Sequence, residues 1–324
     1  MREHLAVICA VVALVAPAQR QRAPVPRKPT PAPARLPCGD PIGFQVLLDR
    51  AGFSPGEIDG TIGANAQHAL AAVQEAKKLP ATAQADCATW RALGGDTAGA
   101  LVVPYQITDD DVKGPFEMEI PRDLDKQAEL PAMSYRNVGE KLGERFHVSP
   151  AVLQRMNQGK AFAAGTSIVV PAVTPFDPDA KPTLDAAAGD VTIQVTKGES
   201  SARVTKSDGT LLFYAPVTTG SEHDPLPIGD WKALGIDWHP PFHYNPDLFW
   251  DAKPTQTRAT IKPGPNNPVG VLWISVNKEH YGLHGTPEPG NIGHTESHGC
   301  VRLTNWDAVR LASFAKPGTP VLFR

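Results

Sequence analysis

The chain has 324 residues, which is enough for two or three domains of ordinary size. Its apolar content of 41% suits globular domains, and a formal net charge of −3 gives no indication of nucleic-acid binding. The 33 prolines gather in segments, which indicates linkers between separate units.

Residues 1–18 have the features of a secretory signal peptide. Arg2 supplies a positive start, LAVICAVVALVA is an apolar core, and Ala16-Pro17-Ala18 offers a cleavage site. This core is too short to span a bilayer as a helix. We therefore expect an exported protein of the periplasm or cell envelope, with no transmembrane span after cleavage. Residues 19–37 are rich in Pro and basic side chains, and we interpret them as a linker.

Residues 38–95 are predicted to form a small helical domain. Phe44, Leu47 and Leu48 begin an apolar stripe with helical spacing, and a second stripe runs through Leu70. The segment FQVLLDRAGFSPGEIDGTIGANAQHALAAVQ, followed by ATWRALG, resembles the peptidoglycan-binding type 1 domain.

The four cysteines have different expected fates. Cleavage of the signal peptide removes Cys9, and Cys38 and Cys87 bracket the helical domain. In an oxidising compartment these two are predicted to form a disulfide. Cys300 is then left as a free thiol, either in a reactive role or as a buried, inert side chain.

A second small unit is expected at residues 131–172, after a connector at 96–130 that includes a possible strand at LVVPYQI. Two helical stripes are separated by Ser149-Pro150, a pair typical of a helix start, and GTSIVVP reads as a closing strand. The stretch YRNVGEKLGERFHVSPAVLQRMNQGKAFAAGTSIVVP resembles a LysM domain, whose order is strand, helix, helix, strand. That resemblance implies binding to peptidoglycan glycan strands. Residues 173–189 are a further linker.

From residue 190 to 324 short β-branched and aromatic runs alternate with turns, which predicts a mainly β domain. The aromatic stretch 238–251 is too irregular to be expected as a strand, and it could be a lid or line a substrate site. The fold class expected for the chain is therefore multidomain α+β.

The stretch Tyr281–Arg302, YGLHGTPEPGNIGHTESHGCVR, carries the candidate chemistry. An imidazole can take the proton of Cys300 and leave a nucleophile for acyl transfer. Gly299 lets the backbone turn sharply, so that amide N–H groups could stabilise an oxyanion. Arg302 could grip a substrate carboxylate with its planar guanidinium.

The run HGTPEPGNIGHTESHGCVRL, with the upstream VTTGSEHDPLPIGDW, closely resembles the L,D-transpeptidase catalytic domain of YkuD type, a β-sandwich. The resemblance implies that Cys300 is the nucleophile and His284 the general base, oriented by the carbonyl of Gly285. It also implies an oxyanion hole from the amides of His298, Gly299 and Cys300. His298 could serve as a second base, but we favour a role for it and Ser297 in framing the turn at Cys300. His294 is expected to be a surface residue.

The activity implied is an exported peptidoglycan L,D-transpeptidase that acts on stem peptides, releases D-Ala, forms 3–3 cross-links and needs no metal or organic cofactor. Water as acceptor would give an L,D-carboxypeptidase, and another amine could attach a protein or a D-amino acid.

A zinc site of His284, His294, His298 and Cys300 lacks helical ligand pairs. A non-catalytic wall-binding protein would not require the Cys–His–Arg set. In papain-like proteases the cysteine precedes the histidine, the reverse of the order in this chain.

Overall fold

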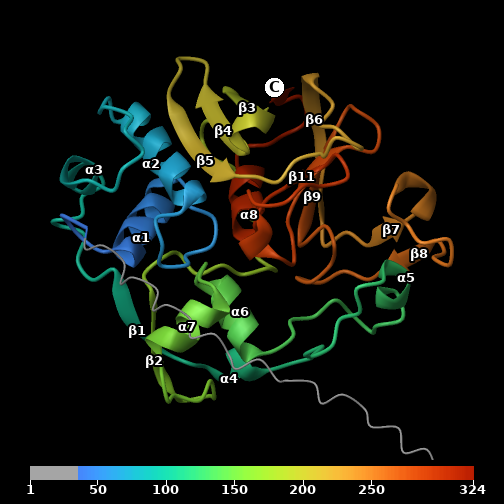
Figure 1. Ribbon diagram of the computed structural model, residues 1–324, viewed down its shortest axis with the longest axis horizontal. Coiled ribbons are helices and arrows are strands. Elements are labelled where there is room, and N and C mark those ends of the chain that lie inside the picture. The colour runs from blue at the N-terminus through green and yellow to red at the C-terminus, as the bar shows by residue number, and fades with distance from the viewer. Residues whose placement is uncertain (1–35) are drawn as a thin grey trace, which may run out of the picture. The chain divides into compact units, whose positions relative to one another are not determined.

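The computed structural model describes residues 36–324 (Figure 1). The signal peptide expected at 1–18 and nearly all of the linker expected at 19–37 lie outside the described residues. Within the described range, no helix combines the length and the apolar character that crossing a bilayer requires.

The first unit contains the two helices expected from the apolar stripes, α1 (Pro41–Ala51) and α2 (Ala64–Ala76), and a third short helix, α3 (Cys87–Ala92). Asp40 caps α1 by accepting a hydrogen bond from the amide of Gly43, and Asp86 caps α3 in the same way. A disulfide joins Cys38 to Cys87, as predicted. The helices bury Phe44, Leu48 and Leu70 in a core that also includes Tyr214 of the C-terminal sheet.

Two paired strands open and close the second unit, but the chain between them forms four helices, two more than the order expected for a LysM domain. Strand β1 (Val102–Gln106) pairs antiparallel with β2 (Ser167–Pro171), and α6 (Val138–Arg145) and α7 (Pro150–Met156) lie between them in sequence. The first strand therefore comes from the possible strand in the segment interpreted as connector, before residue 131. Between β1 and α6 the chain also forms α4 (Asp109–Val112) and α5 (Leu124–Gln127).

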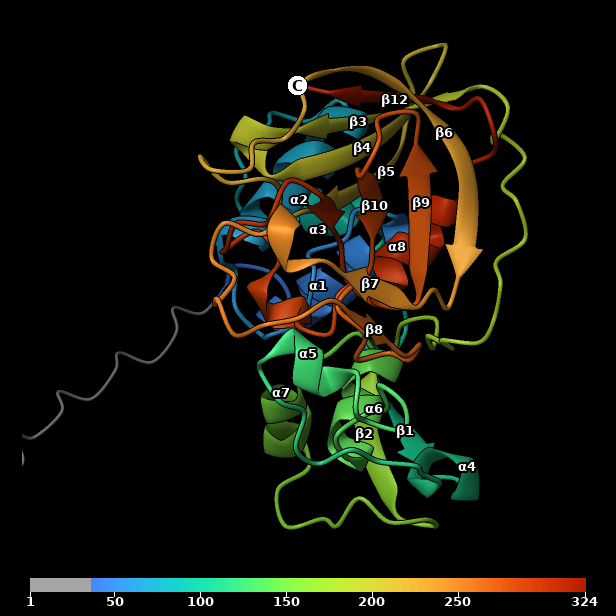
Figure 2. The same ribbon diagram turned by 90° about the vertical axis from the view of Figure 1, so that its right-hand side faces the viewer.

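The third unit is mainly β, as predicted, and its principal strands form one sheet of eight in the order β11-β10-β9-β6-β12-β3-β4-β5. The sandwich expected from the family resemblance thus takes the form of a continuous curled sheet, with α8 (Asn305–Ala312) packed into the same core (Figure 2). The strands are β3 (Val191–Thr196), β4 (Ser201–Lys206), β5 (Leu211–Pro216), β6 (Gly229–Trp238), β9 (Leu272–Val276), β10 (Gly282–His284), β11 (Val301–Arg302) and β12 (Pro320–Phe323).

The aromatic stretch 238–251 was expected to contain no strand, and that expectation was wrong. Strand β7 (Phe242–Tyr244) pairs antiparallel with β8 (Ala259–Ile261), and the two form a separate small sheet. Local periodicity could not reveal a strand of three residues whose partner lies beyond a long loop. We refer to residues 242–261 as the β7–β8 hairpin.

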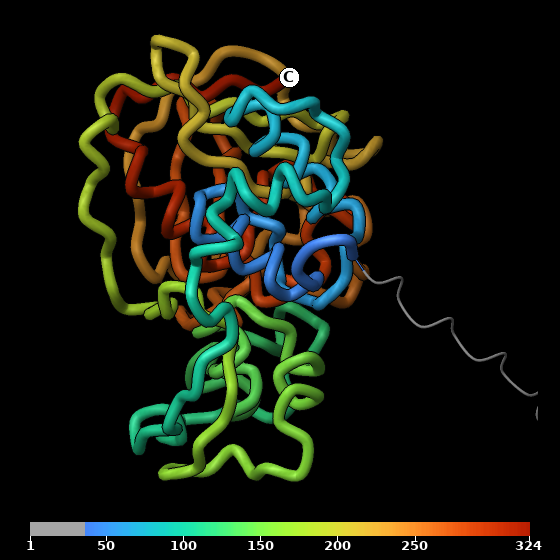
Figure 3. The backbone as a smooth tube through the Cα atoms, turned by 90° about the vertical axis from the view of Figure 1, so that its left-hand side faces the viewer, coloured from blue at the N-terminus to red at the C-terminus, as the bar shows by residue number. Residues whose placement is uncertain are grey.

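Buried polar contacts join the helical units to the C-terminal unit. Ser54 donates a hydrogen bond to the carboxylate of Asp307 at 2.7 Å. Asp49 of α1 lies 2.8 Å from a ring nitrogen of His147, whose imidazole stacks on Trp306 at 5.0 Å. Figure 3 shows the tube of the first helices running alongside the strands of the sheet, where α2 contacts β5. The three units therefore pack together within residues 36–324.

The disulfide gives a stability prediction. Because the two cysteines are 49 positions apart, their bond restricts a long loop of the unfolded chain. Replacing both Cys38 and Cys87 by Ser should lower the free energy of unfolding of the first unit by about 2–4 kcal/mol. Denaturant unfolding followed by fluorescence would measure this. A reductant should lower the free energy of unfolding of the native protein by the same amount and leave that of the variant unchanged. Equal midpoints for the native protein and the variant would contradict the prediction.

Candidate active site

The site forms where two very short strands, β10 and β11, pair in parallel. The register of β10 and β11 sets Leu283 opposite Val301 and His284 opposite Arg302. Leu283 and Val301 are fully buried in the core. Since side chains alternate along a strand, His284, Arg302 and the preceding Cys300 project to the other face. The sequence separates Cys300 and His284 by a long loop, and this register brings them to one side of the sheet.

Ser297 anchors the end of the loop that joins these strands. Its amide donates to the carbonyl of Thr219, and its own carbonyl accepts from Ser221. Its hydroxyl donates to the carbonyl of Cys300 at 2.6 Å. Ser297 therefore frames the turn that carries Cys300, in agreement with the hydrogen-bonding role expected from the sequence.

His284 is held in one tautomer. Its Nδ1 lies 2.7 Å from the carbonyl oxygen of Gly285, which can only accept, so Nδ1 carries the proton and Nε2 keeps a free lone pair. The imidazole is 3% exposed and stacks on Trp273 with ring centres 5.2 Å apart. Burial, with the charge of Arg302, lowers the pKa of His284 to about 3. The ring is therefore neutral at physiological pH, the form in which Nε2 can accept a proton.

Asn305 supports the carbonyl that orients His284, and sequence reasoning missed it. A Cβ built on Gly285 would lie only 2.0 Å from Oδ1 of Asn305, so the backbone at this position packs directly on the amide. Nδ2 of Asn305 donates to the carboxylate of Glu144 at 2.6 Å. Burial raises the pKa of Glu144 to about 7. The second unit thus contributes a buried side chain that contacts Asn305, which itself packs against the residue after the candidate base.

Cys300 lies on a turn that requires glycine before it. Gly299 has φ +102°, and a Cβ there would approach the ring of Tyr281 to 2.7 Å. Within residues 36–324, the side-chain hydrogen bond of the thiol goes to the carbonyl of His280 at 3.5 Å and not to His284. Burial raises the pKa of Cys300 to about 11. The resting site therefore holds a neutral thiol beside a neutral imidazole.

Arg302 has no counter-charge in the described part of the chain. Its Nε is buried without a hydrogen-bond partner, and none of the ion pairs among residues 36–324 includes it. Burial lowers its pKa, because a guanidinium shielded from water loses hydration. This cation is therefore available to an anionic ligand.

His298 contacts the β7–β8 hairpin. Its Nε2 lies 2.8 Å from the carboxylate of Asp251, and its ring centre is 4.7 Å from that of Phe249. The end of the aromatic stretch 238–251 therefore contacts the loop that carries Cys300.

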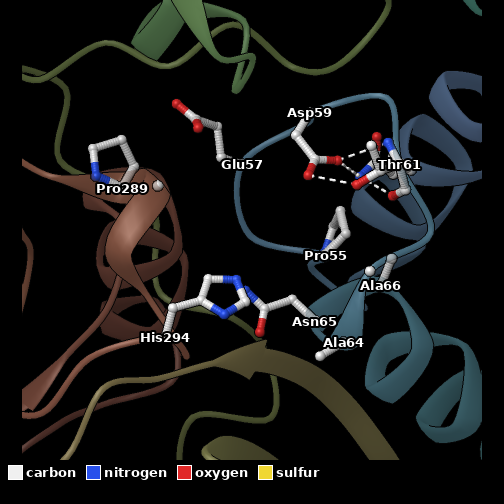
Figure 4. A pocket seen from close by; sticks show the side chains of 12 residues that line it. Pro55, Glu57, Asp59, Thr61, Ala64, Asn65, Ala66, Pro289 and His294 are labelled. Carbon is white, nitrogen blue, oxygen red and sulfur yellow. Dashed lines mark hydrogen bonds between the residues drawn. The ribbon is translucent and has the colours of Figure 1, made fainter. Parts of the chain in front are cut away.

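His294 is exposed, as expected for a surface residue. It lines a cavity between the catalytic loop and the first unit, where the loop bearing Pro289 and His294 faces the segment bearing Asp59 and Asn65 (Figure 4). Across residues 36–324, no group of three or more His, Cys, Asp or Glu side chains is arranged to hold a metal ion.

The raised pKa of Cys300 gives a pH prediction. A thiol with a pKa of about 11 forms more thiolate as the pH rises toward that value. Alkylation of Cys300 by iodoacetamide should therefore accelerate by about tenfold per pH unit above neutrality. Mass spectrometry of labelled peptides would measure the rate. Cys300→Ser provides the control, and Cys38 and Cys87 should stay unlabelled without reductant. A rate independent of pH between about pH 5 and 8 would instead indicate a preformed thiolate–imidazolium pair.

Comparisons with known proteins cover the part of the chain that holds this site. The family model described as "L,D-transpeptidase catalytic domain" (YkuD) matches residues 190–322, and the model "Putative peptidoglycan binding domain" matches residues 42–93. A protein named "Putative L,D-transpeptidase YkuD" from Bacillus licheniformis is 27% identical over 185 residues, which cover 56% of this chain and 90% of that protein. Its Bacillus subtilis namesake is 28% identical over 178 residues, covering 54% and 87%.

Among solved structures, an L,D-transpeptidase from Mycobacterium smegmatis is 20% identical and has a TM-score of 0.34. The match covers 42% of this chain and 58% of that one. The chain is an enzyme that carries an L,D-transpeptidase catalytic domain of the YkuD family at residues 190–322, together with a peptidoglycan-binding-type domain at residues 42–93.

Proposed function

We propose that the protein is an exported peptidoglycan L,D-transpeptidase that forms 3–3 cross-links through a thioester on Cys300. The observation that carries the proposal is the fixed tautomer of His284. This residue lies on β10, which pairs with β11, the strand that directly follows Cys300. A neutral imidazole with a free Nε2 is suited to receive the thiol proton when substrate draws the two groups together.

In the first half-reaction, Sγ of Cys300 attacks the carbonyl carbon of the third residue of a tetrapeptide stem. His284 takes the thiol proton and passes it to the departing nitrogen, so that D-Ala leaves as a free amino acid. The oxyanion formed on the way needs hydrogen-bond donors. Within residues 36–324, the amides of His298, Gly299 and Cys300 have no acceptor, which supports their assignment to this task.

In the second half-reaction, the side-chain amine of a diamino acid in another stem attacks the thioester. Its proton passes through His284 to the departing sulfur, which restores the thiol and leaves a new amide bond. Arg302, a half-buried cation whose Nε has no hydrogen-bond partner among residues 36–324, would bind a carboxylate of the donor stem and hold its carbonyl at the thiol. No metal or organic cofactor takes part.

The first two units would hold the enzyme on its polymeric substrate. The match of residues 42–93 to a peptidoglycan-binding family supports this role for the helical unit. The pairing of β1 with β2 around α6 and α7 supports the proposal that the second unit is a LysM-like module that binds glycan strands. Export to the periplasm or cell envelope follows from the signal-like sequence at residues 1–18 and from the location of the proposed substrate.

Incubation with a disaccharide-tetrapeptide tests the proposal, with products identified by mass spectrometry. A cross-linked dimer that has lost one D-Ala is expected. A tripeptide without dimer would identify an L,D-carboxypeptidase, and unchanged substrate would contradict the enzyme proposal. Cys300→Ala should abolish turnover. His284→Gln should lower kcat by about 100-fold or more, because the proton acceptor is lost.

A further inference from the structure

A cavity of about 280 Å³ lies beside Arg302, and one of its walls does not belong to the C-terminal unit. On one side the cavity is lined by the catalytic loop, including Thr286 and Ile292. On the other side it is lined by residues 120–127, which include α5 and were expected to be a connector. The segment between two units therefore helps to shape the space that Arg302 lines.

Residues 120–127, which we call the connector wall, and the residues just after them are attached to the β7–β8 hairpin and its adjoining residues. The carboxylate of Asp123 lies 2.6 Å from the ammonium of Lys253. The carbonyl of Leu130 accepts a hydrogen bond from Lys262 at 2.7 Å, and Gln127 donates to the carbonyl of Pro121 at 2.8 Å. Figure 2 shows α5 beside β8, with which it makes direct contacts. These bonds hold the wall in a defined position.

Three arginines line the cavity, and they differ in whether an acidic side chain pairs with their positive charge. Arg136 pairs with Glu140 and with Glu288, so its charge is already neutralised. Arg302 and Arg122 have no acidic partner among residues 36–324, and both face the same space. Two unpaired guanidiniums around one cavity favour a ligand with two negative groups.

We propose that this cavity is a subsite for a stem peptide with two free carboxylates, one bound by Arg302 and the other by Arg122 of the connector. The inference rests on the proposed function, because it assigns the substrate class of the same site. Arg302, half-buried and opposite His284 in the strand register, binds the carboxylate nearer the scissile bond. Arg122, exposed at the outer wall, makes residues 120–127 a determinant of which stem peptides are accepted.

Arg122→Gln tests the subsite with two peptides, one with both carboxylates free and one with the outer carboxylate amidated. The variant should raise KM for the dicarboxylate about fivefold and leave kcat within about twofold, since the pair is partly exposed to solvent. For the amidated peptide the KM of the variant and of the native enzyme should agree. Lys126→Gln is the matched control, because this exposed cation lies on the same segment and does not line the cavity.

Direct binding separates this inference from the proposed function. Calorimetry with Cys300→Ala protein, with and without Arg122→Gln, measures the Kd of both peptides without turnover. A Kd that depends on Arg122 only for the dicarboxylate supports the subsite, even if the native enzyme forms no cross-link. If cross-links form but the Kd and KM of both peptides are insensitive to Arg122, or change equally, the subsite is wrong.

Discussion

The site depends on the two-residue parallel pairing between β10 and β11. This pairing sets His284 opposite Arg302 and leaves Cys300 at the start of the same face. Residues 285–300, which join β10 to β11, therefore form a loop with both ends fixed. Ser297 ties the loop to the chain at Thr219 and Ser221, and the positive φ of Gly299 turns the backbone toward Cys300. A change in register by one residue would send His284 into the core and Leu283 to the site.

The helical units contribute to the site as well as to attachment. Asp307 at the start of α8 accepts a hydrogen bond from Ser54 of the first unit, and Asn305 in the same turn donates to Glu144 of the second. Asn305 in turn packs against Gly285, whose carbonyl fixes the tautomer of His284. The candidate base is therefore supported by a buried polar network to which all three units belong. Such networks are costly to leave partly unsatisfied, so separating the units would disturb this support.

Local sequence signals predicted much of this architecture. Apolar spacing and capping residues identified α1, α2, α6 and α7, because those signals lie within a few positions of each other. The cysteine count, read with the expected export, predicted the disulfide. The family resemblance, read from the residues of the loop, predicted that the carbonyl of Gly285 orients His284.

The remaining features depend on contacts between distant positions, for which one sequence offers no signal. Asn305 and Glu144 are 161 positions apart, and the side chain of Glu144 reads as an ordinary charged residue of an amphipathic helix. The strand β7 is specified by its partner β8 and not by its own three residues. The connector becomes a wall of the cavity through ion pairs such as that of Asp123 with Lys253, 130 positions later.

The central claim is that Cys300 carries the acyl group between two stems. Intact-protein mass spectrometry after rapid mixing with a tetrapeptide stem tests it most directly. The account predicts a mass increase equal to the stem without its terminal D-Ala, located on the peptide that contains Cys300 and absent from Cys300→Ala. Release of D-Ala by Cys300→Ala at the native rate would contradict the account, as would an adduct located on any other residue.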